Sequence, residues 1–332
     1  MARDCLPNGT IVGGYEIIKP LSEGGSCLVY SVKNKEGKYF VLKEYYPKRW
    51  NRTEKEFETD FIREGLILKS KKETRIEKMN AVFDSEIKFL NEISFAEYNG
   101  KINNELGAFR AYKVTELEEC FAGTLAQYMI IETASGEVLA EHFGKKEETV
   151  SYIKSVSKLM IRILYHLRQI HSKGILHLDL TPGNVYVCRI HEAEYLPIII
   201  DFGSALNATK DENGLLIAES TCDVHTKSEG FSAPEITLSL NSPETTVITA
   251  QADIYSIGAI IYKLLTDESF STEKIYEWNI DGFVNLESYL FDKISEKFKD
   301  ILPGVIIKLV NILTRCLEKE PNKRYKNCDE LI

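Results

Sequence analysis

Three polar side chains near the middle of the chain have the types and the spacing that phosphate chemistry requires. Asp179 is followed five residues later by Asn184, and Asp201 opens a turn directly after the apolar pair Ile199-Ile200. Carboxylate and amide oxygens are ligands that Mg²⁺ accepts, and a carboxylate beside them can take the proton of a hydroxyl group. The pattern therefore predicts a centre that holds Mg²⁺-bound phosphates beside an acceptor hydroxyl.

The segments before this centre are predicted to be mainly strands. Alternating apolar residues indicate strands at residues 15–21, 27–33 and 38–44, with further strand signals at 109–117 and 128–132. Residues 83–90 have the pattern of a short amphipathic helix. This part of the chain is therefore expected to be small and rich in sheet.

A charged segment from residue 47 to about residue 78 interrupts this pattern. Phe57, Phe61 and Leu68 have helix-like spacing within it, so it is predicted to be a charged helical insertion. Its densest basic patch, residues 69–72, is diluted by glutamates and is expected to be a solvated face of that helix.

The segments around and after the polar centre are predicted to be helices. Residues 252–265 are apolar almost all round, as in a helix at the centre of a lobe, and residues 306–317 predict another buried helix. A third helix is expected to end at Gly174. Its apolar stripe, at spacings of three and four residues, is Val156, Leu159, Met160, Ile163, Leu164, Leu167 and Ile170.

Two features of the predicted strands suggest a bound nucleotide. The small residues of the turn 22–26 would let backbone N–H groups approach phosphate oxygens, although an ordinary hairpin turn explains them equally well. Lys43 lies in mid-strand between apolar residues, where its ammonium needs an anion unless it faces solvent.

The order of these motifs resembles the protein-kinase superfamily, whose signature is His-Arg-Asp with an Asn five residues after the Asp, then Asp-Phe-Gly and Ala-Pro-Glu. The matching residues are Asp179, Asn184, Asp201-Phe202-Gly203 and Ala233-Pro234-Glu235. The run 43–47, preceded by the run 6–10, looks like a group of bacterial eukaryotic-like Ser/Thr kinases that have a Gly-Gly loop. The resemblance spans residues 15–332. It implies an α+β bilobal fold, with a small antiparallel-sheet N-lobe at residues 1–134 and a larger, mainly helical C-lobe at residues 135–332.

The resemblance also implies where ATP would bind. Lys43 would hold the α- and β-phosphates and pair with a helix glutamate, for which Glu86 is favoured over its rival Glu64. Ile131 would be the gatekeeper residue, and backbone groups of Glu132 and Ala134 would bind the adenine edge. The other nucleotide-binding positions would be Leu21, Ser22, Glu23, Gly24, Gly25, Ser26, Val29, Val41 and Tyr186.

The same resemblance assigns roles to the polar centre. Asp179 would be the base or hydroxyl-orienting group, and Asn184 and Asp201 the Mg²⁺ ligands. Leu178 replaces the arginine that binds an activation-loop phosphate, so ordering through that arginine is not expected. Thr181 replaces the usual lysine near the transferred phosphate, which removes one positive charge.

Three further matches concern the segment that would shape a substrate platform. Ser228 takes the position of the threonine usual in Ser/Thr kinases, and Arg324 is expected to pair with Glu235. Asp253, at the start of a predicted helix, would bond the backbone of the catalytic loop or cap that helix.

Composition excludes several other classes of protein. The formal charge of −9 argues against a nucleic-acid binder. The seven scattered cysteines contain no C-x-x-C pair and fit a reducing compartment. Since no apolar stretch predicts a signal peptide or a membrane span, a cytoplasmic chain is expected. Its end at Ile332, within a predicted helix, suggests a domain cut from a longer protein.

These observations predict a Ser/Thr protein kinase that transfers the γ-phosphoryl group of Mg²⁺-ATP to a hydroxyl of a protein substrate. The first alternative is a pseudokinase that binds nucleotide or acts as a scaffold, and the retained Lys43, Asp179, Asn184 and Asp201 count against it. The second is a small-molecule phosphotransferase of related fold, which the Ala-Pro-Glu motif with Arg324 disfavours. The physiological substrate and the oligomeric state stay open.

Overall fold

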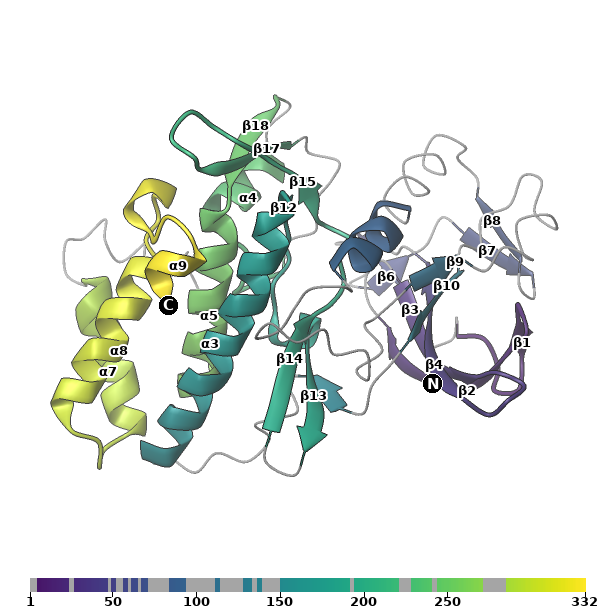
Figure 1. Ribbon diagram of the computed structural model, residues 1–332, viewed down its shortest axis with the longest axis horizontal. Helices are drawn as coiled ribbons and strands as arrows, with labels where there is room; N and C mark the ends of the chain where they lie inside the picture. The colour runs from purple at the N-terminus through teal and green to yellow at the C-terminus, as the bar shows by residue number, and fades with distance from the viewer. Residues whose placement is uncertain are drawn as a thin grey trace. The chain divides into compact units, whose positions relative to one another are not determined.

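The computed structural model in Figure 1 divides into two compact units, Met1–Ala134 and Ser135–Ile332. It describes residues 5–23, 27–46, 49–51, 56–58, 61–64, 67–70, 84–93, 111–113, 128–132, 136–138, 150–191, 194–220, 228–240, 244–270 and 285–332. The first unit is built on an antiparallel sheet and the second mainly on helices. The predicted α+β fold class is therefore confirmed.

The first unit contains a six-stranded sheet with the order β1-β2-β3-β4-β10-β9. Every neighbouring pair in this sheet is antiparallel. The strands are β1 (Ile11–Val12), β2 (Tyr15–Glu23), β3 (Cys27–Lys33), β4 (Tyr39–Tyr45), β9 (Ala111–Lys113) and β10 (Tyr128–Glu132). The strands predicted at residues 15–21, 27–33, 38–44 and 128–132 all appear, with ends displaced by at most two residues.

Local chemistry explains the central hairpin of this sheet. Buried and partly exposed residues alternate along β3, with Leu28, Tyr30 and Val32 buried, as a half-buried strand requires. Between β3 and β4 the side chain of Asn34 accepts a 2.9 Å hydrogen bond from the Lys38 N–H. Gly37 has φ +80°, a left-handed conformation that favours glycine.

A helix over residues 84–93 packs its apolar face into the first unit. Phe89, Leu90 and Ile93 are buried. Their spacing of one, three and four residues places them on one side of a helix. This segment agrees with the helix predicted at residues 83–90.

The charged insertion is not helical where the structure describes it, so that prediction is wrong. It forms two separate hairpins, β5 (Arg49–Asn51) with β6 (Glu56–Glu58), and β7 (Phe61–Glu64) with β8 (Ile67–Ser70). The basic patch begins on β8 rather than on a helix face. Three apolar positions over twelve residues were too few to fix a period, and the aromatic and β-branched residues around them favour strands.

The second unit is built mainly on helices, of which α3, α5 and α8 correspond to the three that the apolar patterns predicted. They are α3 (Val150–Ser172), α4 (Pro234–Leu240), α5 (Gln251–Thr266), α7 (Leu286–Lys297), α8 (Pro303–Cys316) and α9 (Cys328–Leu331). All seven residues of the predicted stripe on α3 are buried. Among the described residues, no helix is both long and apolar enough to cross a membrane.

The central helix of this unit is α5, which packs against α3, α7 and α8 and is buried along nearly its whole length (Figure 1). Gly258 allows the close approach of α8. A Cβ at this position would lie 2.5 Å from the Cβ of Cys316, closer than any van der Waals contact allows. The glycine therefore fixes how tightly the two helices pack.

Short strands of the second unit position the polar centre. The three-stranded sheet has the order β11-β13-β14, from β11 (Gly136–Val138), β13 (Val185–His191) and β14 (Glu194–Ile199). A short 3₁₀ helix, η2 (Pro182–Asn184), leads into β13. β12 (Ile175–Leu176) pairs with β15 (Leu206–Asn207). A third sheet joins β16 (Thr209–Lys210), β17 (Leu216–Ser220) and β18 (Thr246–Thr249).

Candidate active site

In the first unit, Lys43 and Glu86 form a buried ion pair. Lys43 lies on β4 and is 5% exposed, and Glu86 lies on the helix 84–93 and is 3% exposed. The Nζ–Oε1 distance is 2.6 Å. The rival partner Glu64 lies on β7 opposite Ile67, so it is not on a helix. The ion pair expected for Lys43 is therefore made by Glu86, and it gives the buried ammonium the anion it requires.

Four of the residues predicted to surround a nucleotide lie on one face of this sheet. Val29 is the register partner of Lys43, and Ser31 is that of Val41. Directly opposite residues share a face, as do residues two apart on a strand. Val29, Val41 and Lys43 therefore lie on the same side, and Ile131 is the partner of Val41 on β10.

The other predicted nucleotide-binding positions are only partly described. Ser22 and Glu23 end β2, opposite Val29 and Leu28, and Leu21 is half-exposed. Glu132 ends β10, and Tyr186 lies on β13 in the second unit, opposite Ile198. Gly24, Gly25, Ser26 and Ala134 lie outside the described residues.

The loop of the second unit that carries Asp179 is held in place by Asp253, the third residue of α5. Its carboxylate accepts hydrogen bonds from the backbone N–H groups of His177 (2.9 Å) and Leu178 (2.8 Å). His171 lies 2.8 Å away through Nε2. Because the N-cap of α5 is Ala250, Asp253 does not cap the helix. Of the two roles considered for it, the loop-bonding role is the one the structure shows.

This carboxylate is ionised in the folded protein. Burial raises the pKa of Asp253, but the hydrogen bond and electrostatic attraction of His171, together with the hydrogen bond from the backbone N–H of His177, outweigh burial and hold the pKa below its ordinary value. An ionised acceptor strengthens hydrogen bonds to backbone N–H groups. Asp253 can therefore hold Leu178 in a left-handed conformation, φ +63°, which a leucine otherwise avoids.

The side chain of Leu178 is directed into the protein and is 2% exposed. This position therefore offers neither a charged donor nor access to a phosphate. The structure gives a packing role to the residue that replaces the kinase arginine.

Asp179 lies at the centre of a small hydrogen-bond network. Asn184 donates through Nδ2 to the main-chain oxygen of Asp179 at 2.8 Å and to its Oδ2 at 3.2 Å. Ser228 donates through its hydroxyl to Oδ1 at 2.5 Å. Each carboxylate oxygen of Asp179 therefore accepts a hydrogen bond that fixes its orientation. Asn184 faces this carboxylate with its amide nitrogen, so its amide oxygen points away from it.

Asp201 is brought to the same end of the β13–β14 hairpin as Asn184. Val185 and Ile199 are register partners, and the N–H of Ile200 donates to the Asn184 carbonyl at 2.9 Å. Asp201 follows directly, with φ +63°, and its Oδ1 accepts from the N–H of Gly203 at 3.3 Å. The two residues predicted as metal ligands thus flank one hairpin.

The donor set of this hairpin end fits Mg²⁺. An amide oxygen and a carboxylate are hard oxygen ligands, and Mg²⁺ is usually bound by one or two protein groups together with substrate phosphates and water. The described residues contain no group of three His, Cys, Asp or Glu side chains that would hold a metal alone. Asn184 and Asp201 would therefore hold the ion jointly with phosphate oxygens.

His177 supports both sides of this centre. Its Nε2 donates to the carbonyl of Ile200 at 3.0 Å, and its Nδ1 lies 3.4 Å from the N–H of Asp179. Burial lowers the pKa of His177, and the charge of Asp253 only partly opposes this. A neutral imidazole with the proton on Nε2 satisfies both contacts. The ring also lies 4.8 Å from that of Phe202, edge to face.

Residues 228–235 form a platform beside Asp179. The N–H groups of Phe231 and Ser232 both donate to the Ser228 carbonyl at 3.0 Å. Arg324 holds the end of the platform through a bidentate pair with Glu235, at 2.6 and 2.8 Å. The pairing expected for Arg324 is present. Its remaining N–H groups donate to the carbonyls of Gln251, Glu318 and Lys319.

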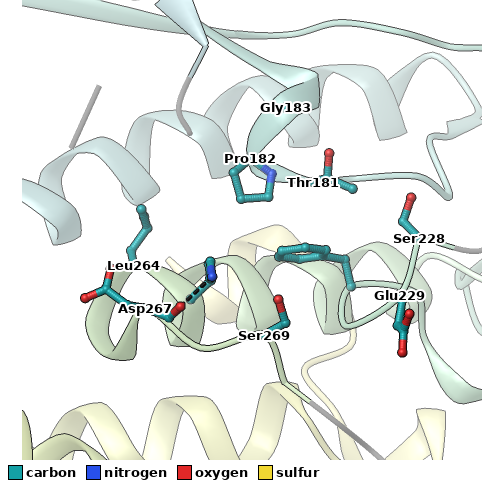
Figure 2. A pocket seen from close by; sticks show the side chains of 10 residues that line it. Thr181, Pro182, Gly183, Ser228, Glu229, Leu264, Asp267 and Ser269 are labelled. Atoms are coloured by element: carbon teal, nitrogen blue, oxygen red, sulfur yellow. Dashed lines mark hydrogen bonds between the residues drawn. The ribbon is translucent and has the colours of Figure 1, made fainter. Parts of the chain in front are cut away.

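A pocket of about 510 Å³ opens next to this platform (Figure 2). One wall is Thr181–Gly183, which follows Asp179 along the chain, and another is formed by Ser228, Glu229 and Phe231. The end of α5 and the turn after it complete the lining. Sequence reasoning did not predict this pocket, because its walls come from three separate parts of the chain.

Two further contacts were missed. Tyr30 donates through its hydroxyl to Oε2 of the fully buried Glu44 at 2.7 Å and accepts from the N–H of Leu6 at 3.1 Å. The alternation of β4 gave a signal, because it places Glu44 on the side opposite to Lys43. The contact of Cys328 Sγ with His171 Nδ1, at 3.8 Å, left no signal in the sequence.

Comparisons with known proteins agree with this geometry. The model of the protein kinase domain family matches residues 15–331. Serine/threonine-protein kinase D of Synechocystis sp. is 24% identical over 330 residues, which cover 98% of this chain and 52% of that protein. Probable serine/threonine-protein kinase fhkA of Dictyostelium discoideum is 26% identical over 327 residues, 89% of this chain and 47% of that protein. The chain spans about half the length of these relatives.

Solved structures show the same fold. The crystal structure of the Mycobacterium tuberculosis PknI kinase domain aligns with a TM-score of 0.55 and 14% sequence identity, over 98% of this chain and 97% of that one. A single mutant of the same domain gives a TM-score of 0.56, also at 14% identity. At such low identity the likeness concerns the fold alone.

Proposed function

Because the chain belongs to the protein kinase domain family, we propose that it transfers the γ-phosphoryl group of Mg²⁺-ATP to a serine or threonine hydroxyl of a protein. One observation carries this proposal. The carboxylate of Asp179 is oriented on both oxygens, by Ser228 and by Asn184, in a loop that the buried Asp253 holds in place. Phosphoryl transfer depends chiefly on such positioning and on charge stabilisation.

Each residue of the centre has a defined task in this proposal. Asp179 orients the acceptor hydroxyl and takes its proton as the new bond to phosphorus forms. Lys43, held by Glu86, supplies a positive charge to the nucleotide phosphates. Bound Mg²⁺ would neutralise charge on the phosphate oxygens, and Asn184 and Asp201 would hold it.

The hydroxyl of Ser228 has a positioning task. It fixes Oδ1 of Asp179 at 2.5 Å, and a carboxylate oxygen has a second lone pair with which to accept from a substrate hydroxyl. The preference for serine or threonine over tyrosine rests on the loop sequence Asp179-Leu180-Thr181-Pro182, which lacks the Ala-Ala-Arg type found in tyrosine kinases.

A pseudokinase is the second candidate, favoured by the position of Leu178 and by the neutral Thr181. The two functions differ in one assay. The purified chain is incubated with γ-labelled ATP, Mg²⁺ and a generic protein substrate, and the label is identified as phosphoserine, phosphothreonine or phosphotyrosine. Label on serine or threonine that depends on Mg²⁺ supports the kinase. Nucleotide binding without any transfer would support the pseudokinase.

A further inference from the structure

A line of polar contacts connects the loop that carries Asp179 to the helix α9. His171, in the last turn of α3, is the middle of this line. Its Nε2 lies 2.8 Å from Oδ2 of Asp253, and its Nδ1 lies 3.8 Å from Sγ of Cys328. Since Cys328 is the first residue of α9, and Asp253 bonds the backbone just before Asp179, the contacts run without a gap from α9 to that loop.

The hydrogen bonds along this line have a definite direction. The carboxylate of Asp253 is ionised, so it can only accept, and Nε2 of His171 donates to it. In the neutral imidazole Nδ1 then carries a lone pair. Burial raises the pKa of the Cys328 thiol, so the sulfur keeps its proton. The S–H group of Cys328 is therefore the donor towards Nδ1 of His171.

The thiol and the imidazole are enclosed together. Cys328 is 1% exposed, and the side chain of His171 is 10% exposed. The next residue of α9, Asp329, pairs with Arg168 of α3 at 2.8 Å, so α9 has a second contact with α3 beside the thiol. A buried acceptor that loses its donor is costly. The imidazole therefore depends on Cys328 to keep Nδ1 satisfied in this position.

This thiol is not arranged for nucleophilic chemistry. A reactive cysteine needs a lowered pKa and access to its partner, whereas burial raises the pKa of Cys328 and leaves its side chain almost fully covered. Its contact with His171 therefore orients the ring rather than activates the sulfur.

We propose that Cys328 is a positioning residue for phosphoryl transfer: it orients His171, which orients Asp253, which holds the loop that places Asp179. The inference rests on the proposed kinase function and adds a residue that acts on that function from α9. Small displacements of a reacting group slow transfer, but a thiol is a weak donor. We therefore expect an effect of about threefold in kcat, without a change in KM.

The test begins with two variants that remove the donor. Cys328→Ala leaves a small cavity, whereas Cys328→Val keeps the apolar volume, so a cavity effect would appear in the first variant alone. Cys316→Ala is the matched control, because the Cys316 thiol is also fully buried but lies on α8, which packs against α5. For each variant kcat and KM are measured with ATP and with a protein substrate, and a thermal melt checks folding.

Two further measurements follow the effect along the line. Amide hydrogen exchange of His177 and Leu178, whose N–H groups bond to Asp253, reports on the loop without requiring activity. The second measurement introduces Cys328→Ala into a His171→Ala background. Since the ring that links the thiol to Asp253 is then absent, Cys328→Ala should cause no further loss of kcat and no further rise in exchange.

The expected result is that Cys328→Ala and Cys328→Val lower kcat about threefold at unchanged KM and raise the exchange of both N–H groups about threefold, while Cys316→Ala does neither. An unchanged kcat, a loss that valine restores, an equal loss in Cys316→Ala, or a loss that persists in the His171→Ala background would overturn the inference. If the folded wild type transfers no phosphate, the kinase function itself fails. The exchange of His177 and Leu178 then still decides whether Cys328 holds the loop.

Discussion

Glu86 binds the ammonium of Lys43 at 2.6 Å across 43 residues of sequence, with both side chains almost fully buried. A buried ammonium that loses its counter-ion must either lose its proton or move towards solvent. Glu86→Gln should therefore lower phosphoryl transfer by about 100-fold, the size expected when one charge-stabilising group is lost. Steady-state kinetics with ATP as the varied substrate measure this.

The control for this prediction is Glu64→Gln, because Glu64 was the other candidate and lies on β7. This variant should retain its activity. A loss confined to Glu64→Gln would show that the described ion pair is not the one that acts in transfer.

Because Arg324 pairs with Glu235 through two hydrogen bonds, we expect arginine and lysine at position 324 to differ in how much they stabilise the fold. All five N–H donors of the Arg324 guanidinium are used, two of them on Glu235. Lysine keeps the charge but cannot present a planar fork. Arg324→Lys should lower the free energy of unfolding by about 2–3 kcal/mol.

Urea denaturation measures this loss, and Arg168→Lys is the matched control. Arg168 pairs with Asp329 on the surface, at 45% and 65% side-chain exposure, where an ion pair contributes about 0–1 kcal/mol. Equal losses in the two variants would contradict the importance of the buried fork.

The buried histidines predict how stability depends on pH. Burial and the nearby His177 lower the pKa of His166 from 6.5 to about 4, and the pKa of His177 is lowered as well. Between pH 6.5 and 4 the unfolded chain therefore binds protons that the folded chain does not. The free energy of unfolding should fall as the pH falls through this window.

His166→Gln tests the contribution of one histidine. Nδ1 of His166 accepts a 2.9 Å hydrogen bond from the N–H of Ile199, and the glutamine carbonyl can replace that acceptor without titrating. Urea unfolding at several pH values should give a shallower dependence for the variant. The lowered pKa of Asp253 acts below 3.8, outside the window. Identical pH dependence in both proteins would count against the assignment.

Because Leu178 replaces an arginine, we predict that phosphorylation of the activation segment, residues 201–235, does not switch the activity on. The leucine is buried and has no donor for a phosphate, whereas an arginine would supply one. Phosphatase treatment of the purified chain should therefore change its activity little. A loss of tenfold or more, about 1.4 kcal/mol in barrier height, that rephosphorylation within residues 201–235 restores would contradict this.

The parts of the fold that the sequence predicted well are those with many periodic positions. Seven apolar residues at helical spacing were enough to fix the buried face of α3. The helix predicted for the charged insertion was wrong because Phe57, Phe61 and Leu68 are compatible with a helix but do not require one. The pairing of β7 with β8 makes this segment a hairpin instead. Pairing between strands is not a local property of either strand.

The candidate site also has parts that the sequence predicted and parts that it did not. Motif order predicted Asp179, Asn184 and Asp201, because their spacing is short and tied to a hairpin. The bond from Ser228 to Asp179 joins residues 49 positions apart, and the pocket joins three separate segments of the chain, so neither could be predicted. Such contacts depend on how the platform packs on α5, which only the folded structure shows.

The most direct test of the kinase function compares wild type with Asp179→Asn, and uses the exposed Asp300→Asn as control. Transfer from γ-labelled ATP to a protein substrate is measured together with the Kd for Mg²⁺-ATP. We predict that Asp179→Asn loses at least about 100-fold in transfer, as expected for a group that takes and orients a proton, while its Kd and the activity of the control stay unchanged. Equal transfer by wild type and Asp179→Asn would contradict the account.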